Sequence, residues 1–434
     1  MTDQSSSNPA FSNEEHQPLL QNKQTTKQES LKDLKPHVKP LASAFFISIV
    51  AGLNDGSIGT IIPRLKDYYS ISNETISLLF LCSALGFFTS AGLNGYIVHK
   101  IGQLNTLYFG SSLMLVSFIV LSMGFPFPVM ACTMPFVGAG MAVLDAGMNV
   151  YTANVPLATL MLNVLHALYG VGAMISPLVA SFLLKHDISW KGMYIFLTSV
   201  AALNIAMISF GFWKVDFEEV HDESDEGQQQ DNVKVNHKEL TKLAIFNKVT
   251  MVSAAYILVY VGVEVTLGGW GYTWLKEGRH GDSIAMANVV SGYWAGLASG
   301  RILLGYLSSR FGEKLMITLF TIMIIAGLVV MMISTNVVLD STAFVAMGLL
   351  LGPMFPTTIS LASKALPRSY HATSIGFVAA LGAGGAALFP FLTGQVAGKF
   401  GILIMPAACI AMSAAMLVLW CFIPSDRPLF GACQ

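Results

Sequence analysis

The stretch GYIVHKIGQ (residues 95–103) recurs as GYLSSRFGE (residues 305–313), and the two copies lie 210 residues apart. Each copy keeps two glycines, with a basic residue two positions before the second glycine. Each copy also follows the second long apolar segment of one half of the chain. Two halves that carry the same loop at the same place are typical of parallel repeats about an axis along the membrane normal. The repeat therefore predicts two similar halves with helices in the same order.

The composition indicates a polytopic membrane protein. Of the 434 residues, 54% are hydrophobic and only 11% are charged, whereas soluble domains carry about 25% charged residues. The net charge is −1 and no basic block is present, which argues against a nucleic-acid partner. The sequence has no nucleotide-binding loop and no nucleophile–base pair at a known spacing, and its five cysteines are scattered. We therefore expect no metal, no cofactor and no enzyme activity.

Twelve segments are long and apolar enough to cross a bilayer, which takes roughly 20 residues per helix. They run near residues 41–63, 76–98, 103–124, 128–152, 160–184, 191–213, 249–272, 284–308, 313–334, 338–362, 371–394 and 401–423. The predicted fold class is an all-α polytopic membrane protein with twelve transmembrane helices in two six-helix pseudo-symmetric bundles. The expected domains are a disordered cytoplasmic tail, an N-terminal bundle, a charged cytoplasmic linker, a C-terminal bundle and a short cytoplasmic tail, over residues 1–40, 41–213, 214–248, 249–423 and 424–434.

The distribution of basic residues predicts the orientation. Five lysines precede the first span, and further basic residues lie in the loops after the second, eighth and tenth spans. With twelve spans all of these fall on one side, which the positive-inside rule makes cytoplasmic, together with both termini.

The N-terminal tail contains the stretch EEHQPLL (residues 14–20). Glu15, Leu19 and Leu20 have the spacing of an acidic dileucine motif, which a sorting adaptor would bind. This motif favours an endomembrane, in particular a vacuolar or lysosomal membrane, and the plasma membrane is the alternative.

The ionisable residues that lie well inside predicted spans are few and include Asp55, Asp145, His166, Glu264 and Arg301. Charged side chains within a bilayer are costly and often mark substrate pathways or proton relays. Each also has a structural alternative. Asp55 could pair with a loop, Asp145 could tie two helices together, and Glu264 could reach toward the membrane surface. His166 could be a core histidine, and Arg301 could be the partner of a carboxylate.

Neutral polar and aromatic side chains accompany these charges. Asn54 precedes Asp55, Asn163 lies three residues before His166, and Asn149 follows Asp145 by four residues, on the same helix face. Several aromatic residues could stack on a flat solute or form an interfacial belt. They are Tyr151, Tyr169, Trp270, Tyr272, Tyr293 and Trp294, and Trp270 and Trp274 in particular resemble interfacial anchors. The glycine-rich stretches over residues 348–356 and 382–385 permit bends and close helix crossings.

The chain resembles the major facilitator superfamily, and within it the fucose:proton symporter branch and its fungal-type members. The segments that carry the resemblance are LNDGSIGTIIPRL, GAGMAVLDAGMNVY, LNVLHALYGVGAMISP, YVGVEVTLGGW, GPMFPTTISLA and GAGGAALFPFLTG, at residues 53–65, 138–151, 162–177, 260–270, 352–362 and 382–394. The repeated loop departs from the superfamily signature, because its usual aspartate is replaced by His99 in one copy and Ser309 in the other.

The resemblance implies a central cavity lined by the first, fourth, seventh and tenth spans. It implies that Asp55 contacts substrate and that Asp145 carries the proton, although the bacterial sugar transporters of the branch usually have glutamate there. Glu264 and Trp270 match the pattern of the seventh span in eukaryotic relatives. We thus expect substrate-binding residues at Asn54, Asp55, Asn149, Asn163, Glu264 and Trp270, and proton-coupling residues at Asp145 and His166.

The expected function is secondary active transport by alternating access. The partners are protons, a sugar-like or other small polar solute, and the lipid bilayer, and symport is the favoured direction of coupling. A proton-driven exporter of drugs or amphiphiles, or a transceptor that does not transport, are the alternatives.

Overall fold

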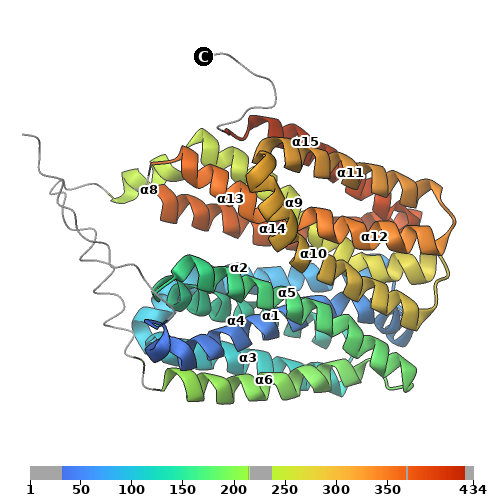
Figure 1. Ribbon diagram of the computed structural model, residues 1–434. Coiled ribbons are helices and arrows are strands. Elements are labelled where there is room, and N and C mark those ends of the chain that lie inside the picture. Colours follow the sequence, from blue (N-terminus) through green and yellow to red (C-terminus); the bar gives the residue numbers. More distant parts are fainter. Residues whose placement is uncertain (1–31, 214, 216–236, 368–369, 426–434) are drawn as a thin grey trace, which may run out of the picture.

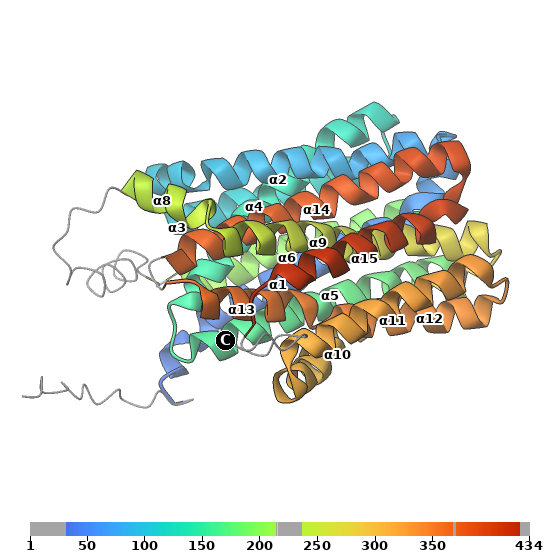
Figure 2. The same ribbon diagram turned by 90° about the horizontal axis from the view of Figure 1, so that it is seen from above.

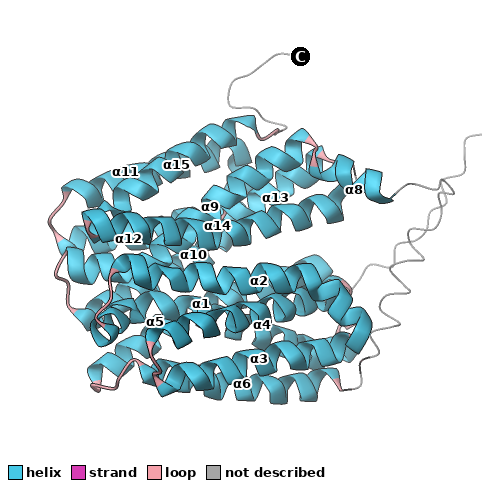
Figure 3. Ribbon diagram, turned by 180° about the vertical axis from the view of Figure 1, so that it is seen from behind, coloured by secondary structure: helices cyan, strands magenta, loops and turns pink. Residues whose placement is uncertain are grey.

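The computed structural model describes residues 32–213, 215, 237–367 and 370–425, and within them the chain is helical with no β-strand (Figure 3). Most of the predicted N-terminal tail, with Glu15, Leu19 and Leu20, lies outside these residues. So do most of the charged linker and the end of the C-terminal tail.

Six long helices form the first half of the chain. They are α1 (Val38–Tyr69), α2 (Asn73–Ile101), α3 (Gln103–Met123), α4 (Phe127–Ala153), α5 (Ala158–Lys185) and α6 (Lys191–Phe212), preceded by the short η1 (Lys35–His37). The main packing pairs are α1 with α5, α2 with α4, and α3 with α4 and α6. Helices far apart in the sequence therefore lie side by side, and α1–α6 form one group below the other helices in Figure 1. We refer to this group as the N half.

The second group, the C half, repeats this order. It contains α8 (His237–Ile245), α9 (Lys248–Thr273), the π-helical η2 (Trp274–Gly278), α10 (Ser283–Phe311), α11 (Glu313–Ile333), α12 (Val337–Leu351), α13 (Met354–Ala365), α14 (His371–Phe400), η4 (Ile402–Ile404) and α15 (Met405–Phe422). The two halves meet where α5 packs on α10, α2 on α14, and α1 on α9 (Figures 1 and 2).

The repeated loop of the sequence forms the same turn in both halves. Gly102 ends α2 with φ +80°, and Gly312 ends α10 with φ +109°, which are backbone conformations that favour glycine. Their backbone N–H groups donate to Val98 O at 2.8 Å and to Ser308 O at 3.0 Å. The next helix starts one residue later in each case. The glycines of the repeat are therefore required by the turn itself.

In the described residues, eleven helices or helix pairs are long and apolar enough to span a membrane. The twelfth predicted span corresponds to α10, which has 29 residues but is less apolar, because it includes Asn288 and Arg301 and several serines and glycines. The predicted span over 338–362 corresponds to one candidate span, Val337–Ala365, within which the structure divides the helix into α12 and α13 at Gly352–Pro353. Proline lacks the N–H that would continue the helix, and a side chain at Gly352 would collide with the α10 backbone.

The helix bundle has two ends, which we call the α8 end and the far end. The α8 end is the end at which α1 and α9 begin, beside α8 (Figure 1). The far end is the opposite end, where α1 terminates and η2 lies.

Candidate functional site

A cavity of about 300 Å³ lies between the two halves. Its polar lining comes mostly from the N half and includes Asn54, Asp55 and Ser57 on α1, Asp145 on α4 and Tyr169 on α5. The C half lines it with Val265 and Gly269 on α9, Trp294 on α10, and Ala383, Ala386 and Ala387 on α14. Large apolar side chains complete the N-half wall, among them Phe80, Phe87, Phe118, Met134 and Met141. The cavity thus has a polar N-half wall and a smooth C-half wall of mostly small residues.

Asp55 is held by two neutral hydrogen-bond donors. The Asn54 amide donates to its Oδ1 at 2.9 Å, and the Tyr169 hydroxyl of α5 donates to its Oδ2 at 2.7 Å. Glycines allow α1 and α5 to approach closely enough for this, because a Cβ at Gly52 or Gly56 would collide with the α5 backbone. The carboxylate is therefore oriented by two helices while it remains exposed toward the cavity.

Asp145 also lines the cavity, from α4, and is half-buried. The Asn149 amide donates to Asp145 Oδ1 at 3.1 Å and to its backbone carbonyl at 2.9 Å. The two residues share one helix face, as their spacing predicts, and Asn149 itself is not among the lining residues. Asn149 is thus placed to orient Asp145 from one helical turn away.

Other predicted site residues lie outside the cavity lining. Glu264 is buried on α9, and its Oε1 lies 3.5 Å from the Arg301 guanidinium of α10. Trp270 is fully buried, and its indole N–H donates to Pro390 O of α14 at 2.8 Å. His166 and Asn163 are exposed on α5, toward the α8 end. Asn54, Asp55 and Asp145 therefore line the cavity and Asn149 contacts Asp145, whereas the other four are not among the lining residues.

The interfacial role expected for Trp270 and Trp274 is wrong, since neither side chain is exposed. Tyr169 has a specific place that its residue type alone does not reveal. Its hydrogen bond to Asp55 joins residues that are 114 positions apart. The alanines of α14 also line the cavity, and only the small residues of the stretch over 382–387 hinted at a close contact there.

The polar contacts that join the two halves in the described residues lie at or toward the far end. Lys66 of α1 pairs with Glu277 of η2 at 2.8 Å. The Gln395 amide of α14 donates to Glu74 O at 3.0 Å and to Ser77 Oγ at 3.1 Å on α2. Nearer the cavity, Ser291 of α10 donates to Met174 O of α5 at 2.8 Å.

Close backbone packing accompanies these contacts. A Cβ at Gly59 of α1 would collide with Gly268 O of α9, whereas a Cβ at Gly92, Gly95 or Gly376, near the α8 end, would meet no atom within 4 Å. The two halves are thus closed against each other at the far end.

Comparison with known proteins identifies the family. The model of the Major Facilitator Superfamily matches residues 44–390 and 252–430. The chain is 26% identical over 410 residues to Bypass of stop codon protein 6 of Saccharomyces cerevisiae, covering 87% of this chain and 80% of that protein. It is 22% identical over 386 residues to the glucose/mannose transporter GlcP of Bacillus subtilis, covering 86% and 91%.

A solved structure of a D-xylose–proton symporter superposes with a TM-score of 0.72 at 12% identity and covers 90% of this chain and 99% of that chain. This likeness confirms the predicted fold class, and the chain is an integral multi-pass membrane protein. The family model covers most of the chain, so the chain belongs to the Major Facilitator Superfamily.

Proposed function

We propose that the chain is a secondary active transporter that moves a small polar solute together with protons by alternating access. The observation that carries this proposal is the cavity between the halves, where Asp55 and Asp145 face the same space. The relative that is named as a glucose/mannose transporter supports a sugar-like cargo. The N half and the C half are the parts that would rock against each other.

The lining residues favour an uncharged cargo that donates hydrogen bonds. Two carboxylates and the Asn54 amide supply acceptors, and no lysine or arginine is among the lining residues that the structure describes. An anionic solute would meet repulsion from Asp55 and Asp145 at short range. The hydroxyl groups of a sugar would find acceptors on the N-half wall, and its apolar face would lie against Trp294 or Phe80. A volume of about 300 Å³ is at the lower end for small-molecule pockets, which suits a cargo of monosaccharide size.

Asp145 is the residue we assign to proton coupling. Its hydrogen-bond donor, Asn149, is neutral, so a proton on Asp145 would leave no cation without a partner. A carboxylate that faces first one side of the membrane and then the other can take up a proton and release it. Asp55, held by Tyr169 and Asn54, is the residue we assign to cargo binding. His166 and Asn163, exposed toward the α8 end, remain predicted contributors on the path to the cavity.

The α8 end would be cytoplasmic on this proposal, as the basic residues indicate. The far end would face the lumen or the outside, and the described conformation would be the one that is closed on that side. An endomembrane location through the Glu15, Leu19 and Leu20 motif remains a prediction from the sequence.

The test begins with purified protein and a library of small solutes. A bound cargo raises the apparent unfolding temperature. Hits are then assayed for uptake into proteoliposomes under an inward proton gradient. We expect Asp145→Asn to lose accumulation above equilibrium while it keeps solute exchange, because a permanently neutral side chain mimics the protonated state. Asp187→Asn is the matched control, since Asp187 lies exposed in the loop after α5 at φ +53°, which asparagine also adopts. Proton-driven accumulation that is unchanged in Asp145→Asn would refute the coupling role.

Export of an amphiphile is a second candidate, and the apolar part of the cavity favours it. Phe80, Phe87, Phe118, Met134 and Met141 offer a surface for an apolar group. The direction of movement decides between the two functions. Solute that leaves vesicles as protons enter would support export, and no solute movement in either direction would favour a receptor role.

A further inference from the structure

The ion pair between Lys66 and Glu277 joins the two halves of the molecule at the far end. Lys66 Nζ lies 3.0 Å from Glu277 Oε1 and 2.8 Å from Oε2, so it contacts both carboxylate oxygens. The two side chains are 14% and 32% exposed. Three other ion pairs, Arg279–Asp340, Arg301–Glu264 and Lys364–Glu313, each join elements of the C half. Of these four ion pairs, Lys66–Glu277 is therefore the one that would have to break if the two halves moved apart at the far end.

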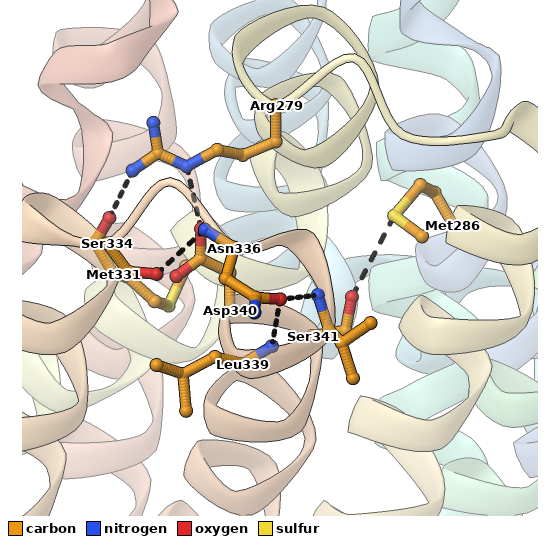
Figure 4. Close-up of polar contacts among 9 residues, drawn as sticks. Arg279, Met286, Met331, Ser334, Asn336, Leu339, Asp340 and Ser341 are labelled. Atoms are coloured by element: carbon orange, nitrogen blue, oxygen red, sulfur yellow. Dashed lines mark hydrogen bonds and ion pairs between the residues drawn. The ribbon is translucent and has the colours of Figure 1, made fainter.

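Glu277 is fixed within the C half by its surroundings. It lies on η2, a π-helical segment that continues α9, and such segments are frequent at functional sites. Two residues later, Arg279 donates to Asp340 Oδ2 of α12 at 2.7 Å and to Met331 O of α11 at 2.5 Å (Figure 4). The Arg279 guanidinium also stacks over Trp274 at 4.6 Å. These contacts attach the segment after α9 to α11 and α12, so Glu277 must move with the C half.

Lys66 moves with the N half, because it lies near the end of α1, which packs along α5 and α6. The far end can therefore open only if Lys66 and Glu277 separate. The neighbouring contacts at this end, Gln395 with Glu74 and Ser77, and Gly59 with Gly268, are neutral or purely steric. Neutral contacts of this kind lose little when water replaces them. Of the contacts at this end, removal of the ion pair is thus expected to have the clearest effect on the balance between a closed and an open far end.

We propose that Lys66 and Glu277 form a latch that holds the far end closed, and that Arg279 is a positioning residue that holds Glu277 in reach of Lys66. This inference rests on the proposed alternating access. According to it, the pair controls the equilibrium between states in which the far end is closed and states in which it is open. It predicts that the latch acts without cargo and without a proton gradient.

The test measures the distance across the far end directly. Spin labels are placed at His186→Cys in the N half and Thr335→Cys in the C half, both of them exposed at this end. The native cysteines are first replaced by serine or alanine. Purified protein in lipid nanodiscs then gives a distance distribution by double electron–electron resonance. Lys66→Gln and Glu277→Gln should each increase the far-end-open fraction relative to the closed one by about fivefold, as expected for a partly exposed pair.

Charge exchange provides the decisive comparison. The double variant Lys66→Glu with Glu277→Lys restores an ion pair of opposite orientation, and we expect the distances to return toward the original distribution. The matched control is Lys364→Gln with Glu313→Gln, which removes a lysine–glutamate pair of 3.1 Å inside the C half and should leave the distances unchanged. Unchanged distances in both Lys66→Gln and Glu277→Gln, or an exchange variant as open as the single variants, would overturn the latch.

Arg279 is tested by its dependence on Glu277. Arg279→Lys keeps the charge but loses the forked geometry, so it should open the far end when Glu277 is present. The same substitution in the Glu277→Gln variant should cause no further opening, whereas equal opening in both backgrounds would refute the positioning role. The outcomes also separate the two proposals. Altered distances in a protein that transports no solute would sustain the latch and defeat the proposed function.

Discussion

Removal of Arg279 should destabilise the far end of the C half strongly. The Asp340 side chain has no exposed surface, and in the described residues its charged partner is Arg279, with Nε 2.7 Å from Oδ2. Arg279→Met leaves this buried carboxylate without a cation, which costs about 3–5 kcal/mol. The lost hydrogen bond to Met331 O adds about 1 kcal/mol. The two costs together are about 4–6 kcal/mol. At roughly 2–4 °C per kcal/mol for a half of this size, the apparent unfolding temperature should fall by roughly 8–24 °C.

The measurement is thermal unfolding of the detergent-purified protein, followed by fluorescence-detected size-exclusion chromatography. The double variant Arg279→Met with Asp340→Leu removes both charges, so it should recover most of the lost stability. Asp340→Leu alone should cost less than Arg279→Met, because Arg279 is 11% exposed and keeps its contacts with Met331 O and Trp274. A double variant as unstable as Arg279→Met would refute the view that the unpaired carboxylate is the source of the instability.

Three further predictions follow from single positions. Ala386→Trp should fill the cavity and abolish the thermal shift caused by a bound cargo, while the unfolding temperature without cargo stays close to that of the original protein. Gly59→Val should push α1 away from α9, since a Cβ there collides with the Gly268 carbonyl, and the label distance across the far end should increase. Lys314→Met should lower the unfolding temperature, because Lys314 donates to the carbonyls of Trp420 and Ile423 at the end of α15. Two unpaired carbonyls cost about 1–3 kcal/mol each when they remain buried, and an unchanged transition would show that water replaces the lysine.

The overall architecture could be predicted because its signals are local. The repeated glycine and basic pattern at residues 95–103 and 305–313 corresponds to two turns that need positive φ at Gly102 and Gly312. The long apolar segments match the helices, and α10 shows that a helix of spanning length tolerates Arg301 when Glu264 of the same half lies within reach.

Features that depend on long-range packing could not be predicted from the sequence. Trp270 resembles an interfacial residue in isolation, but its place is set by a carbonyl at Pro390, 120 positions away. Lys66 and Glu277 look like ordinary charges near loop ends, and their pairing follows only from the way the two halves meet. Gly352 and Pro353 permit a break in a helix, but the close approach of α10, which leaves no room for a side chain at Gly352, appears only in the folded structure.

The distribution of partners favours proton binding in the N half over the C half. Glu264 lies beside Arg301 in a buried site, so a proton on Glu264 would leave the guanidinium without its counter-charge, which is costly in a medium of low polarity. Asp55 and Asp145 have neutral hydrogen-bond partners, Tyr169, Asn54 and Asn149. These partners remain in place whether the carboxyl group is charged or neutral. On the proposed function, the C half would thus act as a fixed electrostatic frame, and the two N-half carboxylates would be the groups whose charge changes during a transport cycle at the smallest cost.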